Sequence, residues 1–270
     1  MTSTDLQNQI RQLFDEATTF KSNGQWPKAV ETYSQIIKLA PTFVPTYVER
    51  GLLIHEMGDP ERAFQDFESA LNLDAQYGPA YYGRGWVKHT RGDFNGEMQD
   101  AKKGLLLDRQ NAGMYYRRIG AAHQGLEQYQ EAIEAYNEAI KFYDGEDEGT
   151  IYNRGLCYLE LNEYASALSD FNKSLEMDPN WAWAFAARAR TFLAMDDCEK
   201  AIADSSKAIS IQPNYVYSYI WRALAYETLG DKKKARNDFE YILKTTKSNQ
   251  LKDLAKQHLQ NLKGGWGWFG

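Results

Sequence analysis

The sequence predicts an all-α protein built as a linear array of helical hairpins, and its self-similarity is the first reason. The steps between equivalent small residues along the chain are 34 or 35 residues. A period of this length is typical of helix–turn–helix repeats, in which each repeat packs only on its neighbours. The residues that define this register are Ala17, Gly51, Gly85, Gly120, Gly155, Ala189 and Ala223.

Each period contains two helical segments separated by a turn, which is the second reason. In the second period, apolar and small residues recur within residues 47–54 and again within 63–71 at spacings of three, four and seven, as in an α-helix. Gly58 and Asp59 separate the segments. Glycine suits a helix C-terminus with positive φ, and an acidic residue suits the next helix start. The same turn is expected at Gly24-Gln25, Gly92-Asp93, Asn162-Glu163, Asp196-Asp197 and Gly230-Asp231.

The small residues of the register indicate that the two helices of a hairpin approach closely. A glycine inside a helix costs about 1 kcal/mol relative to alanine, so its recurrence argues for a steric requirement. The third period departs from the others: Glu97 and Gly104 replace alanines, and Ala101 replaces an aromatic residue. We therefore expect its second helix to pack more loosely.

Three further columns of residues complete the pattern. Alanines repeat on the second helices, large aromatic side chains fill the space beside them, and prolines end several second helices. With the register of small residues, this pattern resembles the tetratricopeptide repeat family. The columns are Ala29, Ala63, Ala132, Ala167, Ala201 and Ala235; Tyr33, Phe67, Tyr136, Phe171 and Phe239; and Pro41, Pro179 and Pro213.

The resemblance covers about residues 10–249 and implies a right-handed α-solenoid of about seven repeats. The amphipathic segment 250–263 is expected to form a helix that caps the apolar end of the array, as solenoids require for solubility. Residues 264–270 follow as a tail of glycine and aromatic residues. The expected repeats span 10–43, 44–77, 78–111, 113–146, 148–181, 182–215 and 216–249.

Charge and cysteine content argue against several classes of protein. The formal net charge is −6, and the basic run 232–234 lies where an outer helix is expected to begin, whereas nucleic-acid binders usually carry a basic face. Cys157 and Cys198 are too few for a disulfide framework. The N-terminus lacks a secretory signal, and no stretch approaches the roughly 18 apolar residues of a membrane span. We expect a cytoplasmic protein that binds no nucleic acid and has no membrane span.

The resemblance also implies where a partner binds. In this family the first helices line a concave groove, and partners bind there as extended peptides or short helices. The groove-facing positions are rich in Trp and Tyr, which are typical anchors of binding surfaces, although the same rings could instead be packing residues between repeats. The candidate groove residues are Tyr82, Trp86, His89, Arg117, Arg118, Tyr152, Asn153, Leu156, Trp183, Arg190, Tyr217 and Trp221.

One specialised groove of the family, the carboxylate clamp that holds the acidic C-terminal tail of heat-shock chaperones, is a poor match. The clamp needs Lys and Asn on one first helix, Asn on the next, and Lys and Arg on the third. Arg117 and Asn153 fit two of these places, but Ala121, Trp183 and Ala187 occupy the others. We therefore do not expect chaperone-tail binding.

A column of arginines directly precedes the small residues of the register. The aliphatic stem of an arginine can pack between repeats while its guanidinium head stays in water. We therefore expect a structural role for this column. Its members are Arg50, Arg84, Arg154, Arg188 and Arg222.

Catalytic chemistry is not expected. The sequence has no phosphate-binding glycine loop, no nucleophile elbow and no zinc-binding helix motif. His55 and His89 hold equivalent places in adjacent repeats, which raises the alternative of a metal site, but no clear third ligand accompanies them. We predict no catalytic residue, no metal and no cofactor.

The least conventional segments leave two alternatives open. Trp266, Trp268 and Phe269 are separated or flanked by glycines, so the tail could cover the capping helix or engage another copy of the chain. The second possibility makes a self-assembling structural protein the alternative to a peptide-binding scaffold. The acidic loop 144–149 is either a hinge or an ordinary loop of variable length.

Overall fold

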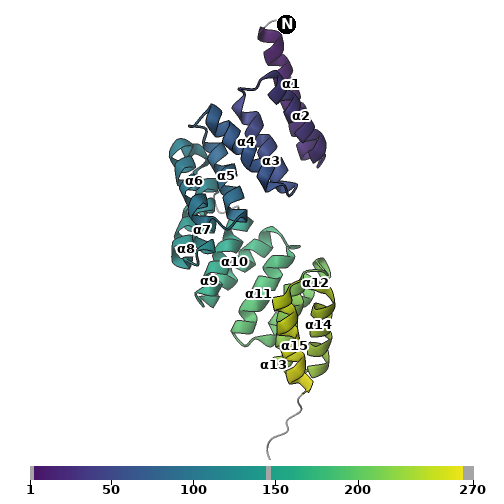
Figure 1. Cartoon of the computed structure of the whole chain (residues 1–270). Coiled ribbons are helices and arrows are strands. Elements are labelled where there is room, and N and C mark those ends of the chain that lie inside the picture. Colours follow the sequence, from purple (N-terminus) through teal and green to yellow (C-terminus); the bar gives the residue numbers. More distant parts are fainter. Residues whose placement is uncertain (1–2, 144–146, 264–270) are drawn as a thin grey trace, which may run out of the picture. The chain divides into compact units, whose positions relative to one another are not determined.

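The computed structural model describes residues 3–143 and 147–263, and the regular elements in these ranges are all helices (Figure 1). The chain divides into two compact units, Met1–Asp144 and Gly145–Gly270. We call them unit 1 and unit 2. Residues 144–146, which are half of the candidate hinge 144–149, and the whole tail 264–270 lie outside the described residues. The predicted all-α fold of paired helices is confirmed.

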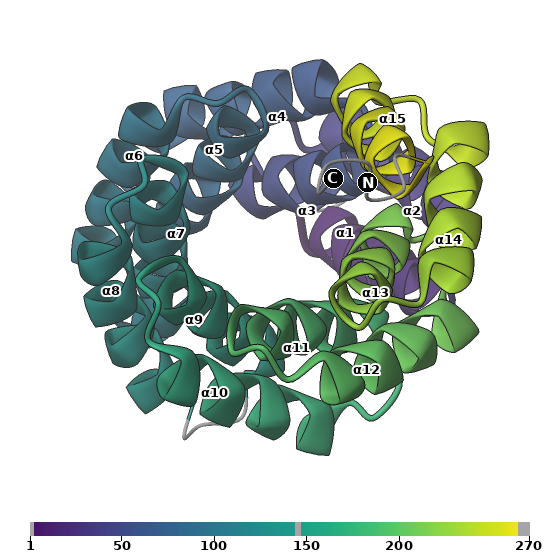
Figure 2. The same ribbon diagram turned by 90° about the horizontal axis from the view of Figure 1, so that it is seen from below.

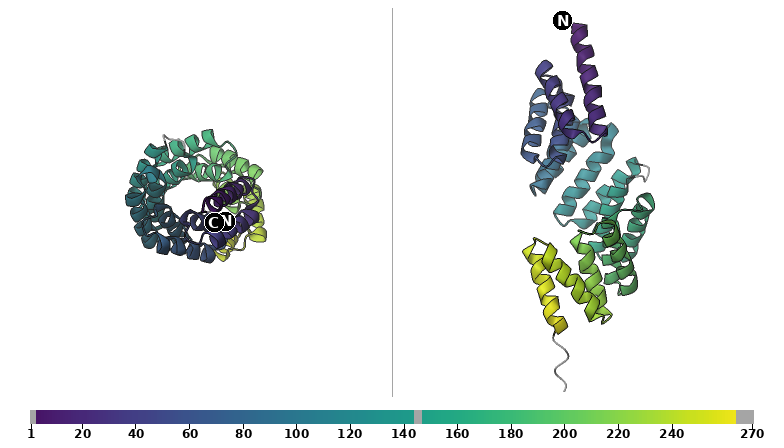
Figure 3. Two further views of the ribbon diagram at one scale, coloured as in Figure 1. Left: turned by 90° about the horizontal axis from the view of Figure 1, so that it is seen from above. Right: turned by 90° about the vertical axis from the view of Figure 1, so that its right-hand side faces the viewer.

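Unit 1 consists of hairpins stacked side by side, in which each helix packs on the next one along the chain. Its first helix is the longest, with 20 residues. Figure 3 shows this helix at one end of the unit, beside its hairpin partner. The helices are α1 (Ser3–Ser22), α2 (Trp26–Leu39), α3 (Val44–Glu56), α4 (Pro60–Leu73), α5 (Gly78–Thr90), α6 (Phe94–Leu107), α7 (Ala112–Gly125) and α8 (Tyr129–Phe142), with a 3-10 turn, η1 (Arg109–Asn111), before α7.

Unit 2 continues the same hairpin pattern and ends with a single helix. The side chains of Ala255 and Leu262 join the apolar cluster formed by the preceding hairpin, and His258 stacks on Phe239 with ring centroids 4.9 Å apart. This final helix therefore covers the apolar side of the last hairpin. The helices are α9 (Glu148–Glu160), α10 (Tyr164–Met177), α11 (Ala182–Ala194), α12 (Cys198–Ile211), α13 (Val216–Thr228), α14 (Lys232–Thr245) and α15 (Asn249–Lys263).

Within each unit the first and second helices of the hairpins form separate layers (Figure 2). In unit 1, α5 contacts both α3 and α7, and in unit 2, α11 contacts both α9 and α13. The candidate groove residues lie on these first helices. In each unit, the candidate groove residues therefore belong to the layer of first helices.

The turns within hairpins have the predicted conformation. Gly24, Gly58, Gly92 and Gly230 have positive φ, and Asn162 and Asp196 take the same conformation, at φ 60°, without being glycine. The residue that follows often caps the next helix: the carboxylates of Asp59, Asp93, Asp197 and Asp231 accept hydrogen bonds from backbone N–H groups three residues on. The fourth repeat makes this turn at Glu127, also at φ 60°, which the sequence pattern did not reveal.

The steric role predicted for the register glycines holds in most of the array. A Cβ added to Gly120 would lie 2.6 Å from the ring of Tyr136 on the second helix, closer than atoms can approach. Gly51 and Gly155 face aromatic rings in the same way. Gly85 differs, because its hairpin carries Ala101 in place of the aromatic residue. An added Cβ there would meet its nearest atoms at 3.5 Å, an ordinary contact.

This difference predicts opposite effects for the same substitution at two equivalent positions. Gly85→Ala is expected to raise the free energy of unfolding by up to about 1 kcal/mol, since alanine favours the helix and meets no clash. Gly120→Ala is expected to lower it by about 1–3 kcal/mol, because the Tyr136 ring must shift in a filled core. Urea denaturation of both variants measures the difference. Equal effects of the two substitutions would contradict the steric explanation.

The expectation that the second helix of the third repeat packs loosely is wrong. Glu97 has no exposed surface, is ion-paired with Arg118 on α7, and lies 2.6 Å from Nδ1 of His89 on α5. The space left beside Gly104 is filled by the ring of Tyr115, which is also fully buried. Larger side chains from adjacent helices thus compensate for the missing ones.

The arginine column forms a ladder of ion pairs and so has the structural role expected from the sequence; the guanidinium heads are paired with carboxylates, and 20–21% of each side chain stays exposed. The Nε and Nη2 of Arg188 donate to the two carboxylate oxygens of Asp204, 16 residues later, at 2.6 and 2.8 Å. Its Nη1 donates to Asn172, 16 residues earlier, at 2.6 Å. Each arginine thus connects its own hairpin, and in several cases also the preceding one. The pairs are Arg50–Asp66, Arg84–Asp100, Arg154–Asp170, Arg188–Asp204 and Arg222–Asp238.

Candidate functional site

The candidate groove residues of unit 1 form one contiguous group on α5 and α7. The guanidinium carbon of Arg118 lies 5.6 Å from the ring centroid of Tyr82 and 5.5 Å from that of Trp86. Arg117 donates from Nη2 to the hydroxyl of Tyr82 at 3.0 Å. Only 8% of the Tyr82 surface is exposed. Tyr82 therefore serves mainly to join the two helices.

A buried carboxylate that the sequence reading did not assign to the site holds this group together. Oε1 of Glu97, on α6, accepts a hydrogen bond from Nη1 of Arg118 at 3.2 Å, and its Oε2 lies 2.6 Å from Nδ1 of His89. The carboxylate has no exposed surface, so it is shielded from water and fixes both partners. One feature of the sequence could have revealed Glu97: it replaces an alanine in the column of alanines on the second helices.

His55 and His89 are not arranged as a metal site. The ring of His55 packs against Trp86 with centroids 4.5 Å apart. Burial and the nearby charge of Arg118 lower the pKa of His55 below its usual value, which favours the neutral imidazole. His89 instead faces Glu97. In the ranges 3–143 and 147–263, no three His, Cys, Asp or Glu side chains are placed to share a metal ion.

Two candidate residues of unit 2, Tyr152 and Leu156, are partly buried against an apolar cluster. Tyr152, on α9, packs against Phe171 and Trp181, with ring centroids at 5.8 and 4.7 Å. Burial raises the pKa of its hydroxyl above the usual value. Leu156 joins the same apolar cluster, and Asn153 is partly exposed beside them. Tyr152 thus contributes to the fold, with little surface left for a partner.

The single candidate arginine of unit 2 is paired within the unit. Nη1 of Arg190 donates to Glu160 at 2.7 Å, and the guanidinium lies 5.7 Å from the ring centroid of Trp221. Trp221 itself packs against the apolar clusters on both sides of α13. The charge of Arg190 is therefore already balanced by a carboxylate.

Two aromatic side chains at the beginnings of α11 and α13 are exposed to solvent, and a third, partly buried, lies beside both of them. Trp183 is 47% exposed and Tyr217 is 46% exposed. Tyr215 lies between them, with ring centroids 6.3 Å from Trp183 and 5.7 Å from Tyr217. We call Trp183, Tyr215 and Tyr217 the aromatic strip. Tyr215 was not among the predicted groove residues, because it caps α13 and so lies outside the helical pattern used to select them.

A shallow depression of about 390 Å³ adjoins the aromatic strip. The side chains around it include two amides, which offer both hydrogen-bond donors and acceptors, and no charged group. The surface can therefore bind an uncharged apolar group and its neighbouring backbone, but has no acid–base pair for catalysis. The lining residues are Asn180, Trp181, Ala182, Trp183, Ile211 and Gln212.

Of the helices in the described part of the chain, none combines the length and apolar character required to cross a bilayer.

Comparison with family models identifies the repeats directly. Models described as tetratricopeptide repeat match residues 150–180 in one case and residues 44–77, 114–144 and 216–248 in another. These matches fall in both units and coincide with the helical hairpins. No protein with curated annotation matches the sequence significantly.

Solved structures with the same architecture include a subunit of the APC/C hetero-tetramer Cut9–Hcn1. It superposes with a TM-score of 0.80 at 16% identity and covers 90% of this chain and 48% of that one. This chain thus spans about half the length of that neighbour. A tetratricopeptide repeat protein from Parabacteroides merdae gives a TM-score of 0.67 at 16% identity and covers 94% of this chain and 99% of its own.

A third structure, YrrB, is described as a TPR protein with an unusual peptide-binding site. It is 26% identical, has a TM-score of 0.52, and covers 70% of this chain and 96% of its own. The first two similarities, at lower identity, show the shared fold alone.

Proposed function

Because the chain belongs to the tetratricopeptide repeat family, we propose that it is a non-catalytic scaffold that binds a segment of a partner protein on the aromatic strip of unit 2. The fold in general supports protein–protein interaction. The observation that carries the finer proposal is the exposure of Trp183 and Tyr217, each close to one half. Exposed apolar side chains that lie side by side often mark a surface that binds another protein.

The chemistry of the aromatic strip suits an extended peptide or short helix with apolar side chains. Trp and Tyr supply large rigid faces and lose little conformational entropy on binding. The amides of Asn180 and Gln212 can bond the backbone of a bound segment. A partner segment with charges at the point of contact would lose hydration without gaining an ion pair. The precedent of YrrB, described as binding peptides, is consistent with this use of the fold.

The proposal predicts that removing the two exposed rings abolishes capture of one partner. In affinity purification from native lysate, the Trp183→Ala/Tyr217→Ala variant is expected to recover that partner at least about tenfold less than the wild type, since each anchor of this kind contributes on the order of 1–2 kcal/mol. Neither ring is buried, so the fold should be retained, as circular dichroism can verify. Trp86 and Tyr152 are poorer targets because both are partly buried and pack against neighbouring rings, so their loss would also disturb the fold.

A matched control removes exposed apolar side chains from second helices. Leu106 is 67% exposed and Phe142 is 53% exposed, so Leu106→Ala/Phe142→Ala deletes comparable apolar surface elsewhere. The control is expected to recover the partner as the wild type does. Equal recovery by all three proteins would show that the strip is not the binding surface.

A further inference from the structure

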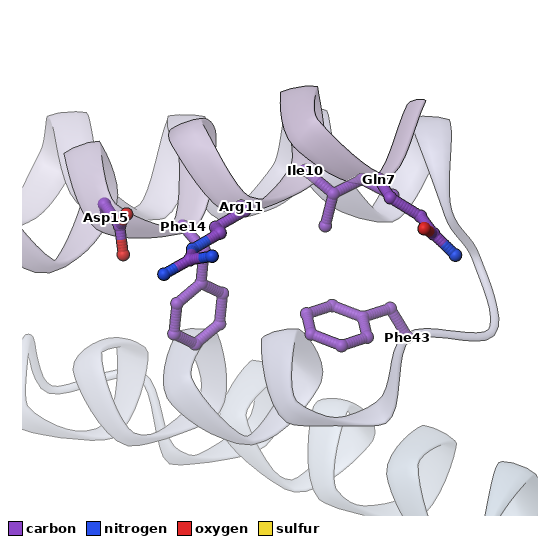
Figure 4. A pocket seen from close by; sticks show the side chains of 6 residues that line it. All are labelled: Gln7, Ile10, Arg11, Phe14, Asp15 and Phe43. Atoms are coloured by element: carbon purple, nitrogen blue, oxygen red, sulfur yellow. The ribbon is translucent and has the colours of Figure 1, made fainter. Parts of the chain in front are cut away.

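A second apolar site, in unit 1, is open to solvent. A pocket of about 380 Å³ lies between α1 and the start of α3 (Figure 4), within the usual size range of small binding sites, about 300–1,000 Å³. Its base is apolar, whereas its rim carries an amide, one positive and one negative side chain. The lining residues are Ile10, Phe14 and Phe43 at the base and Gln7, Arg11 and Asp15 at the rim.

The corresponding place in unit 2 is filled by the chain itself. Phe14 and Tyr152 both lie three residues before a small residue of the register, and Phe43 and Trp181 both cap the following first helix. Tyr152 and Trp181 lie with ring centroids 4.7 Å apart. Phe14 and Phe43 meet edge to face at 6.0 Å, and Phe43 remains 36% exposed. In unit 2, the indole of Trp181 therefore occupies the place that Phe43 occupies in unit 1. The smaller and more distant ring of Phe43 leaves room in unit 1 for a further ring.

The additional N-terminal turns of α1 form the outer wall of the pocket. Helix α1 has 20 residues, whereas α3 and α5 each have 13. Since Ile10 is the register equivalent of Val44, where α3 begins, the turns before Ile10 have no counterpart in those helices. Gln7 belongs to these additional turns and lines the pocket. The extension therefore converts an ordinary helix contact into a site with two walls.

The chain contains a segment whose chemistry matches this pocket. Residues 264–270, which lie outside the described residues, include Trp266, Trp268 and Phe269 and have no ionisable side chain. The opposite charges of Arg11 and Asp15 leave the rim without a net charge, so an uncharged aromatic segment meets no repulsion there. We propose that an aromatic side chain of segment 264–270 from one copy of the protein docks between Ile10, Phe14 and Phe43 of a second copy.

A second copy can supply the segment without any constraint from its attachment to the same chain, whereas docking within one molecule would leave the wild type monomeric at every concentration. Because donor and acceptor are different surfaces, the contact is head-to-tail and can continue from copy to copy.

The test uses two full-length variants that each lack one half of the contact. Ile10→Asp places a charge in the apolar pocket, and Trp266→Ser/Trp268→Ser/Phe269→Ser removes the rings of the segment. Sedimentation velocity over roughly 1–100 µM, the range expected for a contact of one or two rings, measures the mass. The wild type is expected to associate as concentration rises, and each variant alone to remain monomeric at concentrations at least tenfold higher.

Mixing the two variants gives the deciding result. One retains the segment and the other retains the pocket, so the mixture is expected to form a dimer that cannot extend further. Phe43→Ala, at a partly exposed position, replaces Ile10→Asp if the latter alters the circular dichroism spectrum. Leu106→Ala, at a 67% exposed position on α6, is the control and should associate as the wild type does. A monomeric wild type, association that persists in Ile10→Asp and Phe43→Ala, or a mixture that stays monomeric would each overturn the proposal, without bearing on the partner-binding role of the aromatic strip.

Discussion

Glu97→Ala is expected to lower the free energy of unfolding by about 3 kcal/mol, although it restores the residue that the other repeats carry. The substitution leaves Arg118, only 13% exposed, without its carboxylate, and removing one partner of a buried pair typically costs about 3–5 kcal/mol. His89 loses the same partner. Urea denaturation, followed by circular dichroism, measures the effect.

A second substitution separates the ion pair from the packing. Glu97→Ala/Arg118→Leu removes both charges and is expected to be more stable than Glu97→Ala alone, because no buried charge remains unpaired. Ala63 in the second repeat shows that the hairpin accepts alanine at this place. If Glu97→Ala were neutral or stabilising, the column of alanines would be the better guide and the role assigned to Glu97 would be wrong.

Asp204→Ala is expected to destabilise unit 2 by about 2 kcal/mol, below the usual cost of breaking a buried pair because 21% of the Arg188 side chain is exposed to water. The fourth repeat provides a natural design for compensation. In place of the arginine and aspartate it has Ile119 and Ala135, which are 7% and 8% exposed and pack in one apolar cluster. Arg188→Ile/Asp204→Ala is therefore expected to be more stable than Asp204→Ala.

The measurement is again the free energy of unfolding from urea titration of both variants. Asp253→Ala is the control: its carboxylate is 72% exposed and pairs with Lys256 only at the surface, so no measurable change is expected. A double variant less stable than the single one would show that the arginine stem contributes more through packing than the pair does through charge.

The sequence alone was sufficient for the array, its turns and its family, because these depend on local periodicity. It was less informative about individual side chains. Tyr152 and Trp183 occupy places in the same predicted groove, yet Tyr152 is partly buried against Phe171 and Trp181 whereas Trp183 is 47% exposed. Tyr215 was missed because it lies at a helix cap. The peptide-binding role of the predicted groove residues remains a prediction.

The periodic pattern of small, aromatic and acidic residues determined that this chain folds as stacked helical hairpins, since such a pattern repeats within one turn of helix or one period of the array. The tertiary structure decided which charges are paired and which rings remain exposed. Those properties depend on residues far away in the sequence: Asp204 lies 16 residues from Arg188, and Glu97 lies 21 residues from Arg118. The packing of neighbouring helices brings these pairs together, and a pattern of spacings within one helix does not record that packing.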